Sequence, residues 1–419
     1  MAPVYNTPEG RALIERILED HEPPIHPHVY QTEGVAIALD GESLLATMAT
    51  GSGKTGFFAF TMIVMQAIAR DPSLALHDGP TFAKNPAMLI VLPTKALQYD
   101  MQAGLDRLGL NAVVINGDTV LAAAEGNQNL WTECHKKHSM ILISPEELQT
   151  ASFRELLATK EFSARVCRLG IDEVHLIYTW GREFRQTFAQ LGHIRTRLPS
   201  LNGGFIPVIA TSATIREGLP KTMICSTLGL RDGDYHLLRR SNLRQDIRII
   251  VREMISPIGG ASFPELEWTL DSTDNTVIFC KTIGLGFRVA AYLWRKGIAK
   301  GMDQMPSRIR LFNSLNSQSY NEETLGFLND NKQSSITVAT DVLSVGWDSP
   351  FTKNVITVGE LGDIDEFVQK IGRAGRNKTK VQQPCAFLYH SKGPGNYDGR
   401  QHRQLPTRSM QTCQFERAI

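Results

Sequence analysis

The stretch that decides the fold runs from Arg165 to Arg185 and reads RVCRLGIDEVHLIYTWGREFR. Its first residues are apolar enough for a short buried strand, which is expected to end in two neighbouring carboxylates, Asp172 and Glu173. Ligands of open parallel sheets collect at the carboxyl ends of the strands. Two adjacent acids there suit a nucleotide-bound magnesium ion, because one can hold the metal while the other acts on a water molecule. The alternative is a solvated acidic turn, and the other motifs of the chain decide between the two.

A glycine-rich loop follows an earlier predicted strand at Ser43–Met48 and opens an apolar helical pattern. Strand, glycine turn and helix form the phosphate-binding arrangement, in which Gly51 and Gly53 let backbone N–H groups approach the phosphates. Lys54 is expected to reach the outer phosphates, and the Thr55 hydroxyl to ligate magnesium. A glycine-rich loop that only opens a helix is the alternative. The residues expected to hold the nucleotide, with Met48 at a position that is usually Gly, are Met48, Ala49, Thr50, Gly51, Ser52, Gly53, Lys54 and Thr55.

Three further apolar runs each end in a small polar cluster, as does the strand before Asp172. A series of buried strands that delivers polar residues to one edge is typical of a parallel α/β domain. Each cluster taken alone is also consistent with an ordinary helix N-cap. The runs and their clusters are 88–92 with Pro93-Thr94, 140–143 with Ser144-Pro145-Glu146, and 207–210 with Thr211-Ser-Ala-Thr214.

A second α/β series occupies the C-terminal half of the chain. Arg373 and Arg376 lie three residues apart beside two glycines, which suits close approach of guanidinium groups to phosphate oxygens. Arginines that cap a helix C-terminus are the alternative. The expected strands are 247–251, 276–280, 335–340, 354–358 and 385–389. The sequence thus predicts a leader (1–25), a first domain (26–238), a second domain (239–392) and a polar tail (393–419).

Composition limits the remaining possibilities. With 419 residues and a net charge of +1, the chain is long enough for two or three domains and carries no global basic signal for nucleic acid, although a local basic groove stays possible. The six cysteines lie far apart without a C-x-x-C pair, which favours reduced thiols in an intracellular compartment over disulfides or a complete zinc site. The polar first residues predict no signal peptide, and no apolar run is long enough for a membrane span.

The ordered set of motifs resembles the core of superfamily-two helicases over residues 28 to 390. This resemblance implies two tandem RecA-like P-loop domains, each a mostly parallel sheet flanked by helices, with an ATP cleft between them. The matching motifs are Gln31, the loop at 48–55, Pro93-Thr94, Ser144-Pro145-Glu146, the DEVH box at 172–175, Ser212-Ala213-Thr214, Thr340-Asp341 with Gly346 and Asp348, and Gln369 to Arg376.

Within that superfamily the chain resembles RecQ DNA helicases, because Trp180, Phe184 and Arg185 follow the DEVH box where the family has an aromatic-rich loop. In the family this loop senses single-stranded DNA, and exposed aromatic side chains stack on bases for about 1–3 kcal/mol each. Core packing is the alternative for Trp180 and Phe184. The resemblance assigns further nucleic-acid contacts to Pro93, Thr94, Ser144, Pro145, Lys281 and Thr340.

The resemblance also implies the remaining roles in an ATP-driven, 3′-to-5′ DNA helicase or translocase with ATP and Mg²⁺ as cofactors. Asp172 and Thr55 would hold magnesium, Glu173 would polarise the attacking water, and Gln31 would read adenine. Arg373 and Arg376 would stabilise the transferring phosphoryl group, Asp348 would contact the nucleotide, and His175 and Gln369 would link nucleotide state to domain closure. The expected partner is single-stranded or partly duplex DNA, with RNA possible, in a nuclear protein of DNA repair or recombination.

The chain also departs from the RecQ pattern. Pro27 and His28 replace the aromatic residue and arginine expected before Gln31, and the motif at 340–348 is closer to DEAD-box proteins. No zinc-binding or winged-helix module follows the core, so weak unwinding by this chain alone is expected. The alternatives are a DEAD-box-type RNA helicase, a degenerate nucleic-acid-binding module without activity, and a gene fragment without folded function.

Overall fold

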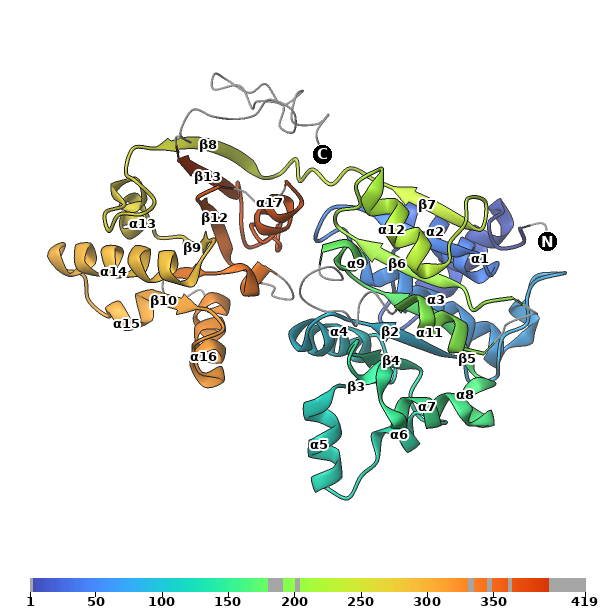
Figure 1. The fold of residues 1–419 in the computed structure, drawn as a ribbon. Coiled ribbons are helices and arrows are strands. Elements are labelled where there is room, and N and C mark those ends of the chain that lie inside the picture. The colour runs from blue at the N-terminus through green and yellow to red at the C-terminus, as the bar shows by residue number, and fades with distance from the viewer. Residues whose placement is uncertain are drawn as a thin grey trace. The chain divides into compact units, whose positions relative to one another are not determined.

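The computed structural model describes residues 3–179, 191–199, 204–330, 335–344, 349–360 and 364–391 (Figure 1). They form two compact units: residues 1–48 and 52–240 make up the first, and residues 49–51 cluster with 241–419 in the second. Each unit is built on one parallel sheet flanked by helices, which confirms the predicted fold class. Within the described ranges, no helix is long and apolar enough to cross a membrane.

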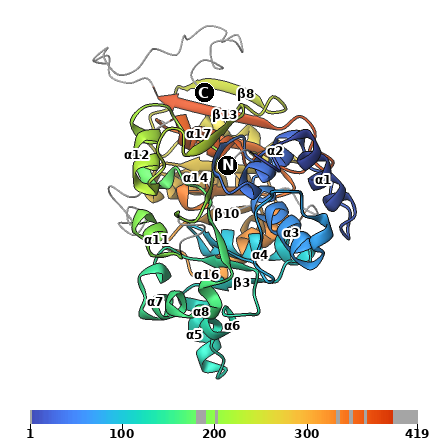
Figure 2. The same ribbon diagram turned by 90° about the vertical axis from the view of Figure 1, so that its right-hand side faces the viewer.

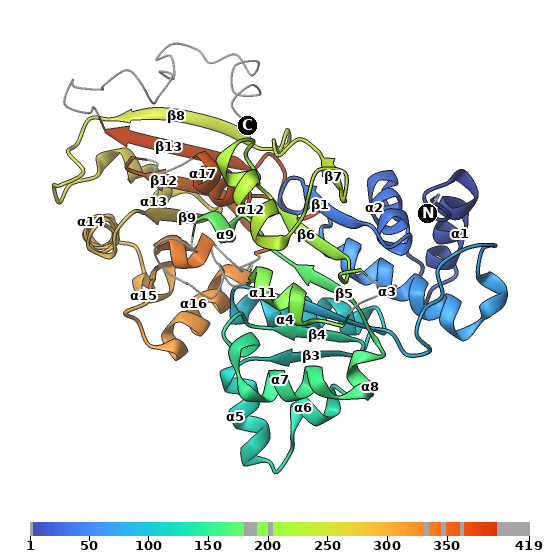
Figure 3. The same ribbon diagram turned by 45° about the vertical axis from the view of Figure 1, so that its right-hand side comes forward.

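The first unit contains a seven-stranded sheet in the order β3-β4-β2-β5-β6-β1-β7, and all of its pairings are parallel. Figure 3 shows these strands from β7 at the top to β3 at the bottom. The strands are β1 (Ser43–Thr47), β2 (Ala87–Val91), β3 (Ala112–Ile115), β4 (Met140–Ile143), β5 (Val166–Ile171), β6 (Val208–Ser212) and β7 (Tyr235–Arg239). The described helices are α1 (Pro8–Glu19), α2 (Val29–Leu39), α3 (Thr55–Arg70), η1 (Pro72–Leu74), α4 (Lys95–Arg107), α5 (Gly117–Glu125), α6 (Leu130–Glu133), η2 (Glu147–Gln149), α7 (Ala151–Ala158), α8 (Lys160–Ser163), α9 (Leu176–Thr179), α11 (Leu191–Arg197) and α12 (Leu219–Leu228).

Both faces of this sheet are covered, which is why its strands read as continuous apolar runs. Along β1, Leu44 packs into the core beneath α1 to α4, whereas Leu45 packs into the opposite core beneath α7, α11 and α12. Met88 and Leu89 of β2 divide in the same way. This two-residue alternation fixes the register, because a shift by one residue would exchange the two faces.

The N-terminal segment belongs to the core of the first unit. The Asp40 carboxylate accepts the backbone N–H groups of Val4, Tyr5 and Asn6 at 2.8–2.9 Å. Tyr5 and Leu18 are fully buried against α2 and α3. The segment that the sequence marks as a leader is therefore anchored to the sheet through α1 and α2.

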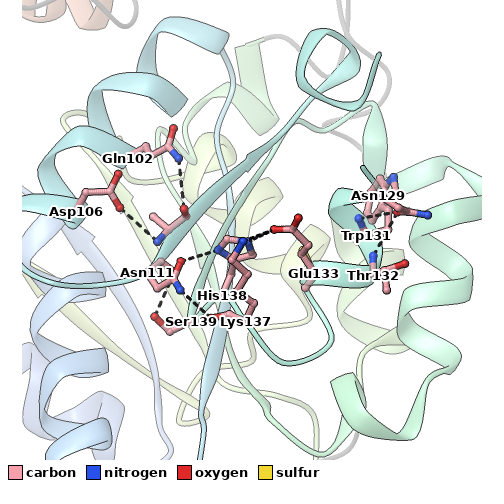
Figure 4. Close-up of polar contacts among 12 residues, drawn as sticks. Gln102, Asp106, Asn111, Asn129, Trp131, Thr132, Glu133, Lys137, His138 and Ser139 are labelled. Atoms are coloured by element: carbon pink, nitrogen blue, oxygen red, sulfur yellow. Dashed lines mark hydrogen bonds and ion pairs between the residues drawn. The ribbon is translucent and has the colours of Figure 1, made fainter. Parts of the chain in front are cut away.

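A polar network closes the β3–β4 side of the first sheet, where α5 to α8 gather (Figure 2). The buried His138 ring places Nδ1 2.7 Å from Asn111 Oδ1 and Nε2 3.2 Å from Glu133 Oε2 (Figure 4). Lys137 pairs with the same Glu133 oxygen at 2.8 Å. Arg165, at the start of β5, donates to the His138 carbonyl at 2.7 Å and so joins this network to the central strand.

The second unit contains a six-stranded parallel sheet in the order β10-β11-β9-β12-β13-β8. Again two cores cover it: Ile278 of β9 packs beneath α14, whereas Val277 faces α17. The strands are β8 (Arg248–Met254), β9 (Asn275–Cys280), β10 (Ile309–Phe312), β11 (Ile336–Ala339), β12 (Thr352–Val358) and β13 (Cys385–Ser391). The described helices are η3 (Pro264–Leu266), α13 (Trp268–Asp271), α14 (Ile283–Ala299), α15 (Met305–Arg308), α16 (Gln318–Asn329), η4 (Asp341–Ser344) and α17 (Ile364–Ile371).

Candidate nucleotide site

The order of the central strands brings the predicted motifs of the first unit together. β6 lies between β5 and β1, with Ile171 opposite Ala210 and Thr47 opposite Ser212. The residues that follow each strand therefore emerge at one edge of the sheet, where α/β proteins bind their ligands. This edge carries the DEVH box, the Thr-Ser-Ala-Thr cluster and the start of the glycine-rich loop.

Asp172 is a buried carboxylate with a defined set of donors. Its Oδ1 accepts from the Thr211 hydroxyl at 2.7 Å and from the Glu173 backbone N–H at 2.9 Å. Burial raises the pKa of Asp172, and the charge of Glu173 adds to this effect. The charge of Lys54 and the hydrogen bond from Thr211 act in the opposite direction on this pKa. The Asp172 carboxylate thus lies in an environment that disfavours its charged form.

Glu173 and His175 belong to a second network at the same edge. His175 Nδ1 lies 2.8 Å from Ser212 Oγ and 3.3 Å from Glu173 Oε2. Ser212 Oγ donates its hydrogen to the Thr214 carbonyl at 3.0 Å and accepts from the Thr214 N–H, so toward His175 it can only accept, which favours a proton on Nδ1. Glu173 itself has a left-handed backbone with φ 51°, which is uncommon for a residue with a side chain. Such strain is found at functional sites.

The glycine-rich loop has the geometry that its sequence predicts. Gly51 and Gly53 have φ of 73° and 80°, and a Cβ at Gly53 would lie 2.6 Å from Gln31 Nε2. Lys54 Nζ donates to the Met48 carbonyl at 3.4 Å across the loop. Thr55, the first residue of α3, is exposed. The loop therefore presents backbone N–H groups, a lysine and a hydroxyl at the start of one helix.

Two side chains of α2 donate hydrogen bonds to backbone carbonyls of this loop. Gln31 Nε2 donates to the Gly53 carbonyl at 2.9 Å, while its Oε1 accepts from the His28 backbone N–H at 2.8 Å. The Tyr30 hydroxyl donates to the Ser52 carbonyl at 2.8 Å. Tyr30 is a residue that sequence reasoning missed, because only its neighbour Gln31 matches a motif.

Tyr30, which directly precedes Gln31, has two neighbours that contact its ring. The His28 ring stacks on Tyr30 with centroids 5.1 Å apart and an interplanar angle of 19°. The Arg240 guanidinium, just past the end of β7, lies 5.1 Å from the centre of the Tyr30 ring. These contacts hold the Tyr30 ring in place beside Gln31.

The residues at this edge fit ATP and magnesium. The Thr55 hydroxyl is an oxygen ligand of the kind that Mg²⁺ prefers, and the Asp172 carboxylate can accept hydrogen bonds from the water shell of the ion, with phosphates supplying further ligands. The glycine-rich loop adds N–H donors for the phosphates. Within the described ranges there is no group of three or more His, Cys, Asp or Glu residues that could hold a metal by itself.

The nucleic-acid residues predicted in the first unit also follow strands of the same sheet. Thr94 caps α4 by accepting from the Leu97 N–H at 3.3 Å, and Ser144 donates its N–H to the Ile115 carbonyl at 3.1 Å. Pro93 and Pro145 are buried. Asn116 follows β3, the edge strand beside β4; it caps α5, and its Nδ2 donates to the buried Gln98 Oε1 at 2.7 Å. Sequence reasoning missed Asn116, because the edge strand before it was not predicted.

In the second unit, the predicted residues occupy the ends of β9 and β11 and the C-terminal part of α17. Lys281 follows β9 and is exposed, and Thr340 follows β11 and is buried. Gln369 and Arg373 are buried in this unit, whereas Arg376 is half-buried and its Nε donates to the Gly372 carbonyl at 3.3 Å. Four of the predicted site residues, Trp180, Phe184, Arg185 and Asp348, lie outside the described residues.

Two cations that the sequence did not mark support this arginine segment. Lys370 is 1% exposed and pairs with Glu366 and, at 2.7 Å, with Asp341 Oδ1. Arg244 Nη2 donates to the carbonyls of Ala374 and Gly375 at 3.2 and 2.9 Å. Lys370 lies inside the quoted motif but has no sign of burial in its sequence context, since lysine is rarely buried.

Family comparisons agree with this geometry. The model of the DEAD/DEAH box helicase domain matches residues 28–222, and that of the helicase conserved C-terminal domain matches residues 262–378. The ATP-dependent DNA helicase RecQ of Haemophilus influenzae is 26% identical over 88% of this chain and 51% of its own length. The putative ATP-dependent RNA helicase R290 of Acanthamoeba polyphaga mimivirus is 23% identical over 86% of this chain and 57% of its own length.

The solved structures show the same fold. The DUF1998 helicase MrfA bound to DNA matches with a TM-score of 0.65 and 18% identity, over 91% of this chain and 51% of that one. Dbp5 of S. cerevisiae bound to RNA and ADP BeF3 matches with a TM-score of 0.63 and 14% identity, over 91% of this chain and 88% of that one.

The chain spans about half the length of the RecQ relative, and 29% of the length of the wrn-1 helicase of Caenorhabditis elegans. The shared part is the pair of domains described above. The chain therefore belongs to the superfamily-two helicases, as a RecQ-like member with a DEAD/DEAH box domain followed by a conserved helicase C-terminal domain.

Proposed function

We propose that this chain is an ATP-dependent DNA helicase or translocase core that moves 3′ to 5′ on single-stranded DNA. The observation that carries the proposal is that the phosphate-binding loop and the DEVH box follow β1 and β5, the two strands that flank β6, at one edge of the sheet. There Lys54 is near enough to act on the pKa of Asp172. A lysine and a carboxylate with a glycine-rich loop at one sheet edge are what phosphoryl transfer needs.

In this proposal the first unit binds ATP and magnesium and activates the attacking water. The loop at 48–55 holds the phosphates through its N–H groups, and Lys54 neutralises their charge. Thr55 and Asp172 hold the magnesium ion, which supplies charge neutralisation at the phosphates. Glu173 accepts a proton from the attacking water, and its contact with His175 ties its position to Ser212. Gln31 reads adenine.

The second unit supplies positive charge for the transferring phosphoryl group. Arg373 and Arg376 take this role in the proposal, with Gln369 and His175 linking nucleotide state to domain closure. Guanidinium groups suit it because they stay charged and bind oxygens in a fixed geometry. The rigid support of this segment by Arg244 is consistent with a group that must be preorganised.

DNA is the proposed substrate because the chain resembles the ATP-dependent DNA helicase RecQ of Haemophilus influenzae. RNA is the second candidate, because relatives and solved structures described as RNA helicases or bound to RNA match over a similar share of this chain. The proposed contacts in both cases are Pro93, Thr94, Ser144, Pro145, Trp180, Phe184, Arg185, Lys281 and Thr340. A nuclear location stays a prediction.

The test is ATP hydrolysis by the purified chain with Mg²⁺, measured without nucleic acid and with single-stranded DNA or RNA of matched sequence and salt. DNA is expected to stimulate hydrolysis more than RNA. Strand displacement on duplexes with a 3′ or a 5′ overhang then tests polarity, and only the 3′ substrate should be opened. Stronger stimulation by RNA would move the assignment to the RNA helicases, and hydrolysis that neither strand changes would contradict a nucleic-acid motor.

A further inference from the structure

Thr211 is a fully buried side chain that none of the motif assignments uses. It follows Ala210 on β6, and Ala210 lies opposite Ile171, the residue before Asp172. This register places the Thr211 hydroxyl beside the Asp172 carboxylate, to which it donates at 2.7 Å.

Both donors to the Asp172 carboxylate bind the same oxygen. The Thr211 hydroxyl and the Glu173 backbone N–H both reach Oδ1, at 2.7 and 2.9 Å. Two donors on one oxygen use its two lone-pair directions and fix the plane of the carboxylate. The other oxygen, Oδ2, is then the one that can accept a hydrogen bond from the water shell of a metal ion.

The backbone of Thr211 is held independently of its side chain. Its carbonyl accepts from the Val174 N–H at 2.9 Å, and on the other side of β6 Thr211 pairs with Ala46 of β1. Removal of the hydroxyl alone should therefore leave β6 and the turn after Asp172 in place. The side chain can be tested without moving the strand.

We propose that Thr211 is a positioning residue that orients the Asp172 carboxylate, so that Oδ2 faces the magnesium ion of a nucleotide held by the loop at 48–55. This inference rests on the proposed ATP site and adds a residue to it. A hydrogen bond to a charged group is worth about 1.5–3 kcal/mol, so its loss should change magnesium-dependent binding by about tenfold or more.

The chain offers a matched control. Thr47 is also a fully buried threonine at the same sheet edge, on the adjacent strand β1, and its hydroxyl is among the buried polar atoms for which the described residues provide no partner. Thr47→Val changes the same atoms as Thr211→Val but touches no carboxylate. It should behave like the unchanged protein.

The experiment measures the affinity of a fluorescent ADP analogue for the whole chain, once with Mg²⁺ and once with EDTA. The ratio of the two affinities isolates the contribution of the metal. Thr211→Val should lose about tenfold of this ratio and keep its affinity in EDTA, whereas Thr211→Ser should stay within about twofold of the unchanged protein. If Thr211→Val does not fold, Thr211→Ala carries the same comparison.

The outcomes separate the two levels of the proposal. An unchanged ratio in Thr211→Val, or an equal loss in Thr211→Ser, would overturn the role of the hydroxyl while leaving the ATP site intact. If the unchanged protein shows no magnesium-dependent binding, the ATP site itself is wrong, and the role of Thr211 fails with it. In steady-state hydrolysis, the half-saturating Mg²⁺ concentration should rise in Thr211→Val more than KM for nucleotide does.

Discussion

The first unit gathers carboxylates at a strand end, whereas the second gathers cations near the end of a helix. Asp172 and Glu173 are held by side chains of the neighbouring strand, through Thr211 and through Ser212 with His175. The arginine segment after α17 is instead held by backbone carbonyls that accept from Arg244. The two units thus have similar parallel sheets but differ in the charge of their candidate site residues. They also differ in whether hydrogen bonds to side chains or to backbone carbonyls hold these residues in place.

This difference predicts which substitutions should affect each site. A carboxylate oriented by side-chain hydroxyls depends on single hydrogen bonds, so small changes there should alter binding or chemistry without unfolding. The arginine segment is held through its backbone carbonyls by Arg244, so it depends on its local conformation and on the buried Lys370 that precedes it. Changes there should reduce the stability of the second unit as well as activity.

The largest effect is expected at Arg376, the predicted phosphoryl-stabilising arginine of the second unit. Arg376→Ala should bind nucleotide with similar affinity and lose about 10³ in turnover, the low end for such arginines, because Arg373 lies in the same segment. Nucleotide binding and single-turnover hydrolysis measure the two effects separately. Arg295→Ala, an exposed arginine on α14, is the control. A large loss of affinity with unchanged turnover would contradict the role.

A large loss of stability is expected at Lys370. Lys370→Met removes a buried cation and leaves Asp341 and Glu366 without their shared partner. Because Asp341 and Glu366 both reach solvent, the loss of these charged hydrogen bonds should cost roughly 1.5–3 kcal/mol in the free energy of unfolding. Chemical denaturation measures it.

Lys353→Met is the control for Lys370, since Lys353 pairs with Asp274 at the surface of the same unit. That change should cost about 1 kcal/mol or less. Equal losses in the two variants would show that burial does not set the strength of the Lys370 pairs.

Gly375 tests whether local conformation supports the arginine segment. Its φ is 55°, and an added Cβ would lie 2.5 Å from Pro384 Cγ. Gly375→Ala should therefore destabilise the second unit by roughly 1–3 kcal/mol. Gly326→Ala, in α16 with open space around it, should instead gain about 0.5–1 kcal/mol. Thermal unfolding of both variants gives the sign of each change in stability. A Gly375→Ala protein as stable as the unchanged protein would show that this position does not require glycine.

The smallest effect concerns His138 at the far side of the first sheet. Burial lowers the pKa of His138, and the charges of Lys137 and Arg165 add to this, whereas the hydrogen bond to the Glu133 carboxylate and the charge of that carboxylate oppose it. Because the folded state binds the proton less tightly than the unfolded state, stability should fall as the pH drops below the ordinary histidine pKa of about 6.5.

His138→Gln isolates the contribution of His138 to the pH dependence of stability. The difference in unfolding free energy between pH 7 and pH 5 should be smaller in this variant than in the unchanged protein, as measured by denaturant titration at both values. His77→Gln, whose ring is almost fully exposed, is the control and should leave the difference as it is. A steeper pH dependence in His138→Gln would show that the charged ring stabilises the network.

Much of the fold could be predicted because the central strands are buried on both faces and read as apolar runs. β2, β4, β5, β9 and β12 fall where their patterns place them, within two residues. The edge strands β3, β7 and β10 were not predicted, because each pairs with one neighbour only, and β7 and β10 carry polar residues such as His236 and Arg310 instead of a continuous apolar run. The role of α1 in the core also depends on tertiary contacts that no local pattern contains.

The residues of the candidate site also fall into those that the sequence predicts and those that only the structure shows. Lys54, Asp172, Glu173 and His175 follow strands in recognisable motifs, and the structure brings them to one edge of the first sheet. Thr211, Tyr30 and Lys370 were missed as contributors, because their contacts come from other strands or from the opposite side of a loop. Spacing along the chain predicts which residues face an edge, but not which hydrogen bonds form there.

The most direct measurement is Mg²⁺-dependent ATP hydrolysis by the whole chain, compared with Glu173→Gln, with and without single-stranded DNA. The unchanged protein should hydrolyse ATP and be stimulated by DNA. Glu173→Gln should bind ATP with similar affinity and lose at least about 100-fold in rate, since general-base catalysis contributes roughly 10²–10⁴. Equal rates in the two proteins, or no hydrolysis by the unchanged chain, would contradict a catalytic site at the end of β5.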